Sequence, residues 1–436
     1  MLKSALKKIT PTSFKFFLIK ILNYRPVFYL KYQFRKIKLG QEVLLKELKK
    51  KEIINVIFLV IHESIWKYDQ IYRLLDNDPK FNVKIVIIPL VRRDQLGQMD
   101  TYYQTVNYFT DNGYNIVESY DKINNFWKDI KFLTKPDIVF FTNPHRLTFD
   151  KYYIYNFKNV LTCYVPYAFV VIHSIEMHYD QFIFKALWKY FLETNQHKVF
   201  ARNYIKDFGS NLIVSGYPGL DNKFELGFKP KNVWKEYKID KTYKIIWAPH
   251  HTISGQGSGL DYSSFMDYAH YFVELLSIKS NIQIAFKPHP LLKEKLYKDS
   301  KWGVEKTDKY YKYWNELPNG QLEEGPYVDL FHFSDAMIMD SASFIVEYLY
   351  FDKPIAFTKK DDEVLERFNT FGKKVFNYLY LIKSTEELDE FIDEIIINKN
   401  DYLKMTRNQF LNEKILPKNG KTASENIYNE LLKELC

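Results

Sequence analysis

The chain has 436 residues, of which 46% are hydrophobic and 26% are charged, and its net charge is +9. This length allows two domains of ordinary size, and the composition is that of a soluble globular protein. The two cysteines, Cys163 and Cys436, are too few for a disulfide framework or a structural zinc site, so a reducing compartment is expected.

The positive charge predicts an anionic partner. The sequence shows no zinc-finger spacing, no RNP-type strand and no basic region followed by heptads, so nucleic acid is not expected as that partner. An anionic membrane surface or a phosphorylated substrate fits better.

Residues 1–50 are expected to form a basic amphipathic segment that associates with a membrane. Its stretch Met1–Leu39 is rich in lysine, arginine and aromatic residues and contains no acidic residue. Lys15 and Lys20 interrupt the apolar run, which is then too short for a transmembrane helix of about 20 apolar residues. Such a segment favours the interface of an anionic leaflet. The alternative is a helix that docks on its own protein and exposes its lysines to solvent.

Strands and helices then alternate in residues 51–220, which we interpret as an N-terminal, acceptor-binding domain. Apolar runs predict parallel strands at Ile53–Ile61, Val83–Pro89, Asp137–Phe141, Val160–Val165 and Asn211–Ser215. Helices are expected at Ile65–Leu75, near Gln98–Asp111 and at Gln181–Glu193. This alternation is typical of a doubly wound sheet.

A second series occupies residues 221–384, after a hinge expected near Gly216–Lys231. Its predicted strands are Tyr243–Ala248, Ile282–Phe286, Ala336–Met339 and Pro354–Thr358. Its predicted helices are Ser263–Ile278, a helix from Leu291, Tyr327–Phe333 and Ser343–Tyr350. Residues 385–436 are expected to form C-terminal helices. The fold class is therefore α/β, with two Rossmann-like doubly wound domains that face a cleft, a favoured place for ligands.

The motif KPHP follows the predicted strand Ile282–Phe286. Lys287 and His289 lie two residues apart and so share one side of an extended segment, which the two prolines of the motif stiffen. A fixed lysine and histidine suit a phosphate group. The alternative is a rigid strand exit with a solvated lysine.

His250 and His251 also follow a predicted strand directly. Histidine donates hydrogen bonds to phosphate and titrates near neutral pH, so contact with the phosphate or base of a nucleotide is favoured. Capping or packing is the alternative. A histidine pair could bind a metal, but no third ligand stands at helical spacing, and no metal is expected.

Asp340, Ser341 and Ser343 stand between a predicted strand and a predicted helix. Ser or Asp in that place is an ordinary N-cap. The same geometry also makes an anion site at the positive end of a helix. Glu347, one turn on, could accept hydrogen bonds from ribose hydroxyls. We therefore predict that Asp340, Ser341, Ser343 and Glu347 bind a nucleotide donor together with His250, His251, Lys287 and His289.

Four motifs in this order resemble the CDP-glycerol glycerophosphotransferase family of teichoic-acid and capsule polymer enzymes. They are GYPGLD (Gly216–Asp221), WAPHH (Trp247–His251), KPHP (Lys287–Pro290) and SDAMIMDSASFIVEY (Ser334–Tyr348). The resemblance covers about a third of the chain. It implies a glycosyltransferase-B-like fold, CDP-glycerol or a related CDP-alditol as donor, no required metal or other cofactor, and a place at the inner face of the bacterial cell membrane.

The sequence departs from the family pattern in its N-terminal half. The family carries a Trp-His-Gly motif there whose histidine is the proposed base, whereas the matching region, Leu161–Phe169, has no histidine. His62, at the end of the first predicted strand, His145 and His173 are the available replacements. Near-neutral general-base chemistry suits histidine in a cleft.

The predicted reaction transfers glycerol phosphate, or a related alditol phosphate, to a hydroxyl of a cell-surface polysaccharide or lipid-linked, teichoic-acid-like acceptor. A nucleotide-sugar glycosyltransferase of the same fold is the alternative, because this pocket would serve either donor. A third hypothesis is that the chain is a membrane-bound subunit that binds nucleotide or polymer and does not catalyse a reaction.

Overall fold

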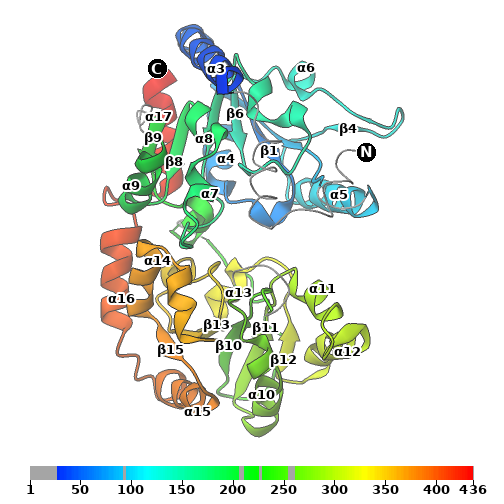
Figure 1. Cartoon of the computed structure of the whole chain (residues 1–436), viewed down its shortest axis with the longest axis vertical. Helices are drawn as coiled ribbons and strands as arrows, with labels where there is room; N and C mark the ends of the chain where they lie inside the picture. Colours follow the sequence, from blue (N-terminus) through cyan, green and yellow to red (C-terminus); the bar gives the residue numbers. More distant parts are fainter. Residues whose placement is uncertain (1–26, 92–94, 206–210, 225–227, 254–260, 436) are drawn as a thin grey trace, which may run out of the picture.

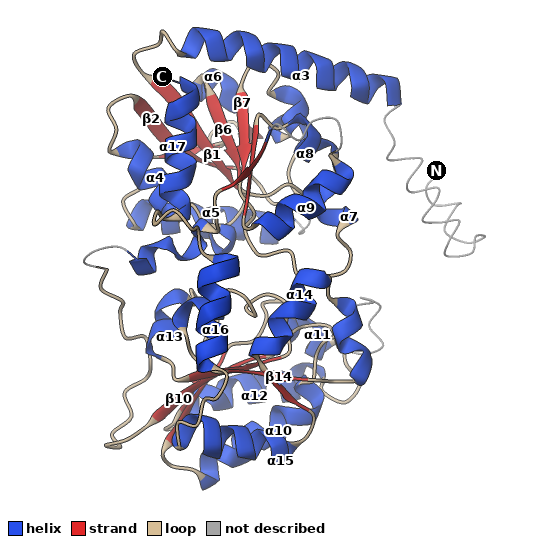
Figure 2. Cartoon of the chain, turned by 90° about the vertical axis from the view of Figure 1, so that its left-hand side faces the viewer, coloured by secondary structure: helices blue, strands red, loops and turns tan. Residues whose placement is uncertain are grey.

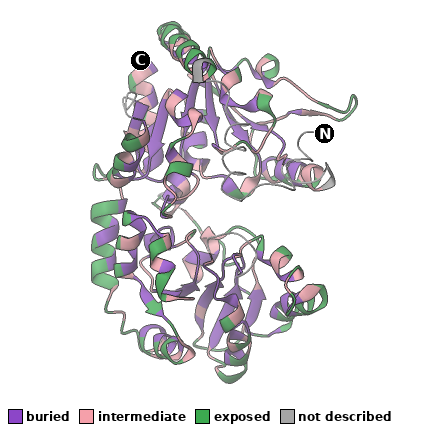
Figure 3. Ribbon diagram, viewed as in Figure 1, coloured by how far each residue is buried: buried purple, intermediate pink, exposed green. Residues whose placement is uncertain are grey.

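Two parallel sheets, one above the other in Figure 1, form the cores of two domains. The structure is a computed structural model of the chain that describes residues 27–91, 95–205, 211–224, 228–253 and 261–435. In both domains the inner strands of the sheet are buried, and helices cover them (Figure 3).

The first sheet has seven strands in the order β3-β2-β1-β6-β7-β8-β9, and every pairing in it is parallel. In chain order the strands are β1 Ile54–Val60, β2 Phe81–Ile87, β3 Ile116–Glu118, β6 Ile138–Phe141, β7 Leu161–Tyr164, β8 Lys189–Leu192 and β9 Leu212–Val214. A short antiparallel pair, β4 Tyr120–Asp121 and β5 Phe126–Trp127, lies outside this sheet.

The second sheet has six strands in the order β12-β11-β10-β13-β14-β15, again all parallel. The strands are β10 Tyr243–Ala248, β11 Ile282–Phe286, β12 Gly320–Leu322, β13 Ala336–Met339, β14 Ile355–Thr358 and β15 Tyr380–Ile382. The strand order reverses beside β1 in the first sheet and beside β10 in the second. Ligands of open α/β sheets bind beyond the carboxyl ends of the strands at these switch points.

Helices surround both sheets. In the first domain they are α3 Val27–Leu48, α4 Asp69–Asp76, α5 Gln95–Asp111, α6 Ile130–Thr134, α7 Glu176–Tyr179, α8 Phe182–Ala186 and α9 Asn195–Tyr204. In the rest of the chain they are α10 Phe265–Ile278, α11 Leu292–Tyr297, α12 Gly303–Glu316, α13 Val328–Phe333, α14 Thr370–Val375, α15 Thr385–Glu390, α16 Lys404–Phe410 and α17 Ala423–Leu435. Short 3-10 helices include η1 Glu63–Ile65, η5 Pro218–Phe224 and η6 Tyr348–Phe351.

The last helix returns to the first domain. Figure 2 shows α17 beside α4, while α16 lies with the second domain. Asp221, of the motif GYPGLD, caps α17: its carboxylate accepts hydrogen bonds from the N–H groups of Ser424 at 2.6 Å and Ala423 at 3.3 Å. Lys189 of β8 pairs with Glu430 and Glu434 of α17, each at 2.6 Å. The C-terminal helices therefore tie both domains together.

Helix α3 docks one face on the first domain. Ile37 is fully buried, and Gln41 Nε2 donates to Thr162 Oγ1 at 3.1 Å. A Cβ at Gly40 would lie 2.1 Å from the Lys158 carbonyl oxygen, so glycine allows this close approach. The opposite face of α3 is exposed. Residues 1–26 of the expected membrane segment lie outside the described residues.

Two predicted helices are wrong. The stretch Gln181–Glu193 splits into α8 and the strand β8, whose residues are all buried. Ser343–Tyr350 forms turns followed by η6. Both stretches are almost continuously apolar, and such runs do not distinguish a buried strand or turn from a buried helix.

Candidate functional site

Three histidines lie together where the neighbouring strands β10 and β11 end. Ring centroids are 4.2 Å apart for His250 and His251, 4.1 Å for His251 and His289, and 5.1 Å for His250 and His289. The histidines belong to separate motifs in the sequence, and the parallel pairing of β10 with β11 brings them together. Their nitrogens lie within 4.8 Å of one another, so His289 is the third potential metal ligand that sequence spacing did not reveal.

The tautomers of two of these rings favour an anion over a metal ion. The Leu291 N–H donates to His289 Nδ1 at 3.1 Å, and the Thr252 N–H donates to His250 Nδ1 at 3.3 Å. A neutral imidazole that accepts at Nδ1 carries its proton on Nε2. It then offers a hydrogen-bond donor there, whereas a metal needs an unprotonated nitrogen.

Burial keeps the three histidines neutral. It lowers the pKa of His250 to about 2, that of His251 to about 4 and that of His289 to about 3, with further lowering by neighbouring charges. Burial also lowers the pKa of Lys287 to about 8, although Glu323 and Glu324 oppose this effect. At pH 7 the site therefore combines neutral N–H donors with a charged lysine.

Asp340 holds the loops of this site in place. It follows β13 and is 1% exposed. Its carboxylate accepts hydrogen bonds from the His250 N–H at 2.5 Å, the Ser264 N–H at 2.7 Å and the Ser264 hydroxyl at 3.0 Å. Burial nevertheless raises its pKa to about 6. Asp340 thus positions His250 and the start of α10.

Ser341 and Ser343 stand on a turn at the end of β13. The Ser341 hydroxyl accepts from the Ser343 N–H at 3.0 Å, and Ser343 is exposed. The expected helix N-terminus is not formed there, so its dipole does not contribute. The exposed Ser343 and the turn remain open to a ligand.

Glu347 is buried, and both of its oxygens already accept hydrogen bonds. Oε1 accepts from the Tyr217 hydroxyl at 2.8 Å, and Oε2 accepts from the Tyr327 hydroxyl. Burial raises the pKa of Glu347, and the nearby Lys67 opposes this shift. In this conformation the tyrosine hydroxyls occupy the positions that we predicted for a ribose.

The three candidate bases of the first domain lie in different places. His62 follows β1, beside the switch point, and its Nδ1 lies 2.7 Å from the Ser64 hydroxyl. His145 follows β6 on the other side of that switch point and contacts Gln181 at 3.2 Å. His173 bonds to the Arg367 carbonyl of the second domain through its N–H at 2.9 Å and its Nδ1 at 3.0 Å.

Sequence comparison identifies the family. Residues 181–433, more than half of the chain, match the family described as CDP-Glycerol:Poly(glycerophosphate) glycerophosphotransferase. The chain belongs to this family. The membership that the four motifs indicated is thereby confirmed.

Among curated proteins, the chain is similar to the teichoic acid ribitol-phosphate polymerase TarL of Staphylococcus aureus (strain NCTC 8325 / PS 47). It is 23% identical over 246 residues, which cover 52% of this chain and 39% of TarL. The chain therefore spans well under half of the length of that relative.

Solved structures share the fold. A variant of the wall teichoic acid polymerase TagF matches with a TM-score of 0.54 at 11% identity, over 93% of this chain and 98% of that one. The S. aureus MnaA–UDP co-structure matches with a TM-score of 0.54 at 15% identity, over 88% and 97% of the two chains. These likenesses confirm the expected glycosyltransferase-B-like architecture.

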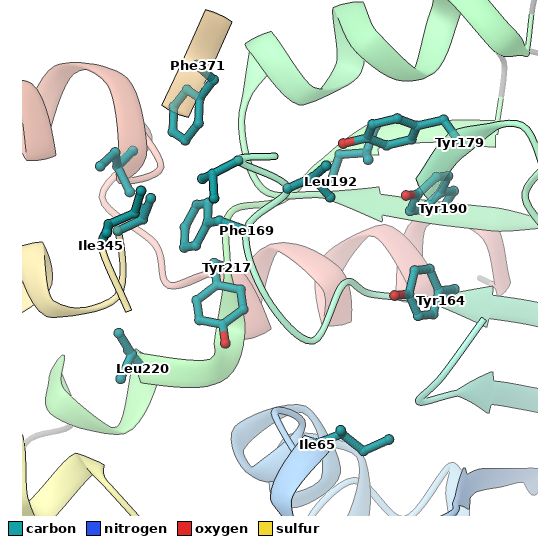
Figure 4. Packing of buried hydrophobic residues seen from close by; sticks show 14 of the residues in the cluster. Ile65, Tyr164, Phe169, Tyr179, Tyr190, Leu192, Tyr217, Leu220, Ile345 and Phe371 are labelled. Carbon is teal, nitrogen blue, oxygen red and sulfur yellow. The ribbon is translucent and has the colours of Figure 1, made fainter. Parts of the chain in front are cut away.

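The stretch that follows β7 leads into a contact between the domains. After β7, Ile172 pairs with Phe368 in an isolated antiparallel bridge. Asn369 donates to the Val170 carbonyl at 2.7 Å through Nδ2 and to the Val171 carbonyl at 2.8 Å through its N–H. Figure 4 shows Phe169, Tyr217, Ile345 and Phe371 packed in this junction.

Sequence reasoning missed Lys67, Tyr217 and Tyr327. Tyr217 lies in the motif GYPGLD, and no local pattern there indicates a role for the tyrosine. Lys67 lies between η1 and α4, inside a stretch predicted as one helix, and this concealed its position in a loop. Long-range contacts brought these side chains to Glu347, and local spacing carries no signal for such contacts.

Proposed function

We propose that this chain transfers glycerol phosphate, or a related alditol phosphate, from CDP-glycerol or a related CDP-alditol to a hydroxyl group of a teichoic-acid-like or other cell-surface polymer. Family membership over residues 181–433 carries the proposal. The histidine and lysine cluster at the switch point of the second sheet supports it, because such donors suit a diphosphate.

The proposed step is an in-line displacement. An oxygen of the acceptor forms a bond to the β-phosphorus of the donor, the bond from that phosphorus to the bridging oxygen breaks, and CMP leaves with the bonding electrons. A base of the first domain takes the acceptor proton. Lys287 and the N–H groups of His250 and His289 meet the phosphate charge, so positioning and charge stabilisation do most of the catalysis.

No resident cofactor is part of the proposal. The Nε2–H tautomers of His250 and His289 support direct contact with phosphate oxygens. The donor is a substrate, and the acceptor is a polysaccharide or lipid-linked chain.

A nucleotide-sugar glycosyltransferase is the second candidate, because a solved structure of similar fold holds a nucleotide sugar. It is a UDP-GlcNAc 2-epimerase from Neisseria meningitidis bound to UDP-GlcNAc. The match has a TM-score of 0.52 at 16% identity and covers 87% of this chain and 99% of that one. The purified chain should be offered CDP-glycerol, CDP-ribitol and common nucleotide sugars. Release of CMP from a CDP-alditol is the expected result. Release of UDP or GDP from a sugar donor would favour the second candidate, and nucleotide binding without turnover would indicate a non-catalytic subunit.

We also propose a peripheral place at the inner face of the cell membrane. Within the described residues no helix is both long and apolar enough to cross a bilayer. The outward face of α3 carries Lys31, Tyr32, Arg35, Lys36 and Leu39, all exposed. Basic and aromatic side chains on one face suit an anionic leaflet.

A further inference from the structure

The charge of the proposed donor exceeds what its closest groups supply. A CDP-alditol carries one negative charge on each of its two phosphates, and CMP leaves as a dianion. His250 and His289 are neutral donors, which leaves Lys287 as the cation of the KPHP motif. Transfer of a phosphoryl group depends on cations that neutralise the charge developing on the leaving group. A further cation near Lys287 would serve that purpose.

Lys67 reaches across the junction from the first domain. It is partly buried between η1 and α4, and its Nζ donates to the Tyr327 hydroxyl of the second domain at 2.8 Å. The same ammonium group lies 4.6 Å from the centre of the Tyr327 ring. Tyr327 in turn donates to Glu347. Burial lowers the pKa of Lys67, and the Glu347 charge opposes this shift.

Lys67 and Lys287 meet the same short segment. Lys287 Nζ donates to the Gly325 carbonyl at 2.7 Å, two residues before Tyr327. The charge of Lys67 also contributes to the lowered pKa of Lys287. One lysine thus comes from each domain, Lys67 from the loop between η1 and α4 and Lys287 from the end of β11, and both bond to the segment that runs from Gly325 to Tyr327. Like charges held together in a partly dry place favour an anion between them.

We infer that Lys67 is a phosphate-binding residue of the donor site, which the first domain supplies opposite Lys287. The inference rests on the proposed function, and it names the residue by which the acceptor domain contacts the donor. The ammonium group exchanges its bond to the Tyr327 hydroxyl for bonds to the diphosphate. The simpler alternative is that Lys67 serves only as a structural counter-ion for the buried Glu347.

The two alternatives differ in how affinity depends on the phosphates of the ligand. Calorimetric titration should compare cytidine, CMP and CDP on the unaltered chain, on Lys67→Met and on Lys67→Arg. Loss of a charged partner of a phosphate should raise the Kd for CDP by about tenfold to a hundredfold. The Kd for cytidine should change less than about twofold, and Lys67→Arg should recover most of the CDP affinity because it keeps the charge. Lys122→Met, an exposed lysine of the first domain, is the matched control and should bind all three ligands like the unaltered chain.

If Lys67→Met folds and loses affinity equally for cytidine and for CDP, Lys67 has only a structural role, and the inference is overturned. If Lys67→Met does not fold, Tyr327→Phe takes its place, since it frees the ammonium group without removing it. That variant should bind CDP more tightly and cytidine as before, because Lys67 no longer gives up its bond to the Tyr327 hydroxyl; CDP affinity that does not rise relative to cytidine affinity would overturn the inference. No CDP binding by the unaltered chain would overturn the proposed function and the inference with it. CDP binding that Lys67→Met leaves intact would overturn the inference alone.

Discussion

At the scale of single residues, the backbone around the histidine cluster decides its chemistry. The N–H groups of Thr252 and Leu291 point at the Nδ1 atoms of His250 and His289, so each ring presents its Nε2–H to the site. Burial keeps both rings uncharged at neutral pH. Each ring can therefore donate one hydrogen bond to a phosphate while it stays neutral, and a bound phosphate would raise the pKa of both histidines.

The neutral state of His289 has a consequence for stability. Its pKa in the folded chain is lowered to about 3, below the unfolded value of about 6.5, so the unfolded chain binds the proton first as the pH falls. The contribution of His289 to stability is thus present above pH 6.5 and is lost as the pH falls toward 3. His289→Gln does not titrate in this range. As the pH is lowered from 7.5 to 5, the free energy of unfolding of this variant should therefore rise by up to about 2 kcal/mol relative to that of the unaltered chain. Urea unfolding at both pH values measures the difference, and a difference independent of pH would contradict the assigned burial.

The general base is a second question at this scale. We expect one of His62→Ala, His145→Ala and His173→Ala to lower the transfer rate by about 10²–10⁴ while donor affinity is kept, since general-base catalysis contributes about that much. His62, which follows β1 at the switch point, is the first choice. His173 already bonds to the Arg367 carbonyl, so its loss should disturb the domain contact as well. Parental rates in all three variants would place the base elsewhere.

At the scale of elements, the ends of β10, β11 and β13 gather the predicted donor residues. Each of these strands was visible in the sequence as an apolar run, and β10, β11 and β13 have the predicted bounds. The apolar run at Gln181–Glu193 was misread because β8 is paired on both sides, with β7 and β9, and all of its residues are buried. A strand in such a place lacks the alternation that would distinguish it from a helix.

Helix α3 provides a test of membrane association. Lys31, Arg35 and Lys36 are exposed on its outer face, and changing all three to Gln should weaken binding to anionic vesicles by about a hundredfold, at about 1 kcal/mol for each charge. Vesicle sedimentation at low and high salt measures this. The matched control changes the exposed Lys306, Lys309 and Lys312 of α12 to Gln and should leave binding unaltered. Equal binding by both triple variants and the parent would exclude α3 as the contact.

At the scale of the whole molecule, the loop after β7 and the segment that leads into α14 join the two domains in addition to the chain connection between them. Gly372 of α14 lies so close to the first domain that a Cβ there would stand 2.5 Å from the Val171 carbonyl oxygen. Gly372→Ala should therefore lower the free energy of unfolding by about 1–3 kcal/mol, the usual cost of overpacking. Thermal unfolding measures it, with Gly325→Ala as control because its Cβ would meet nothing within 4 Å. Equal stability of the two variants would mean that the contact between the domains can rearrange around the added Cβ without a measurable cost in stability.

The α/β class, the family, most of the strands and the motifs at their ends were predictable from the sequence. These features are local: an apolar run of strand length followed by polar residues is readable without knowing its neighbours. His250, His289 and Asp340 were found in this way. Their common location was also predictable, because parallel strands end at the same edge of a sheet.

The hydrogen-bond partners of these groups are set by the folded chain. It brought Lys67 to Tyr327 and Tyr217 to Glu347, and it turned Asp221 into the cap of α17. It also set the tautomers and the charge of the histidines. Hydrogen bonds and desolvation depend on atoms that are far apart in the chain, and no local pattern records which of them will meet.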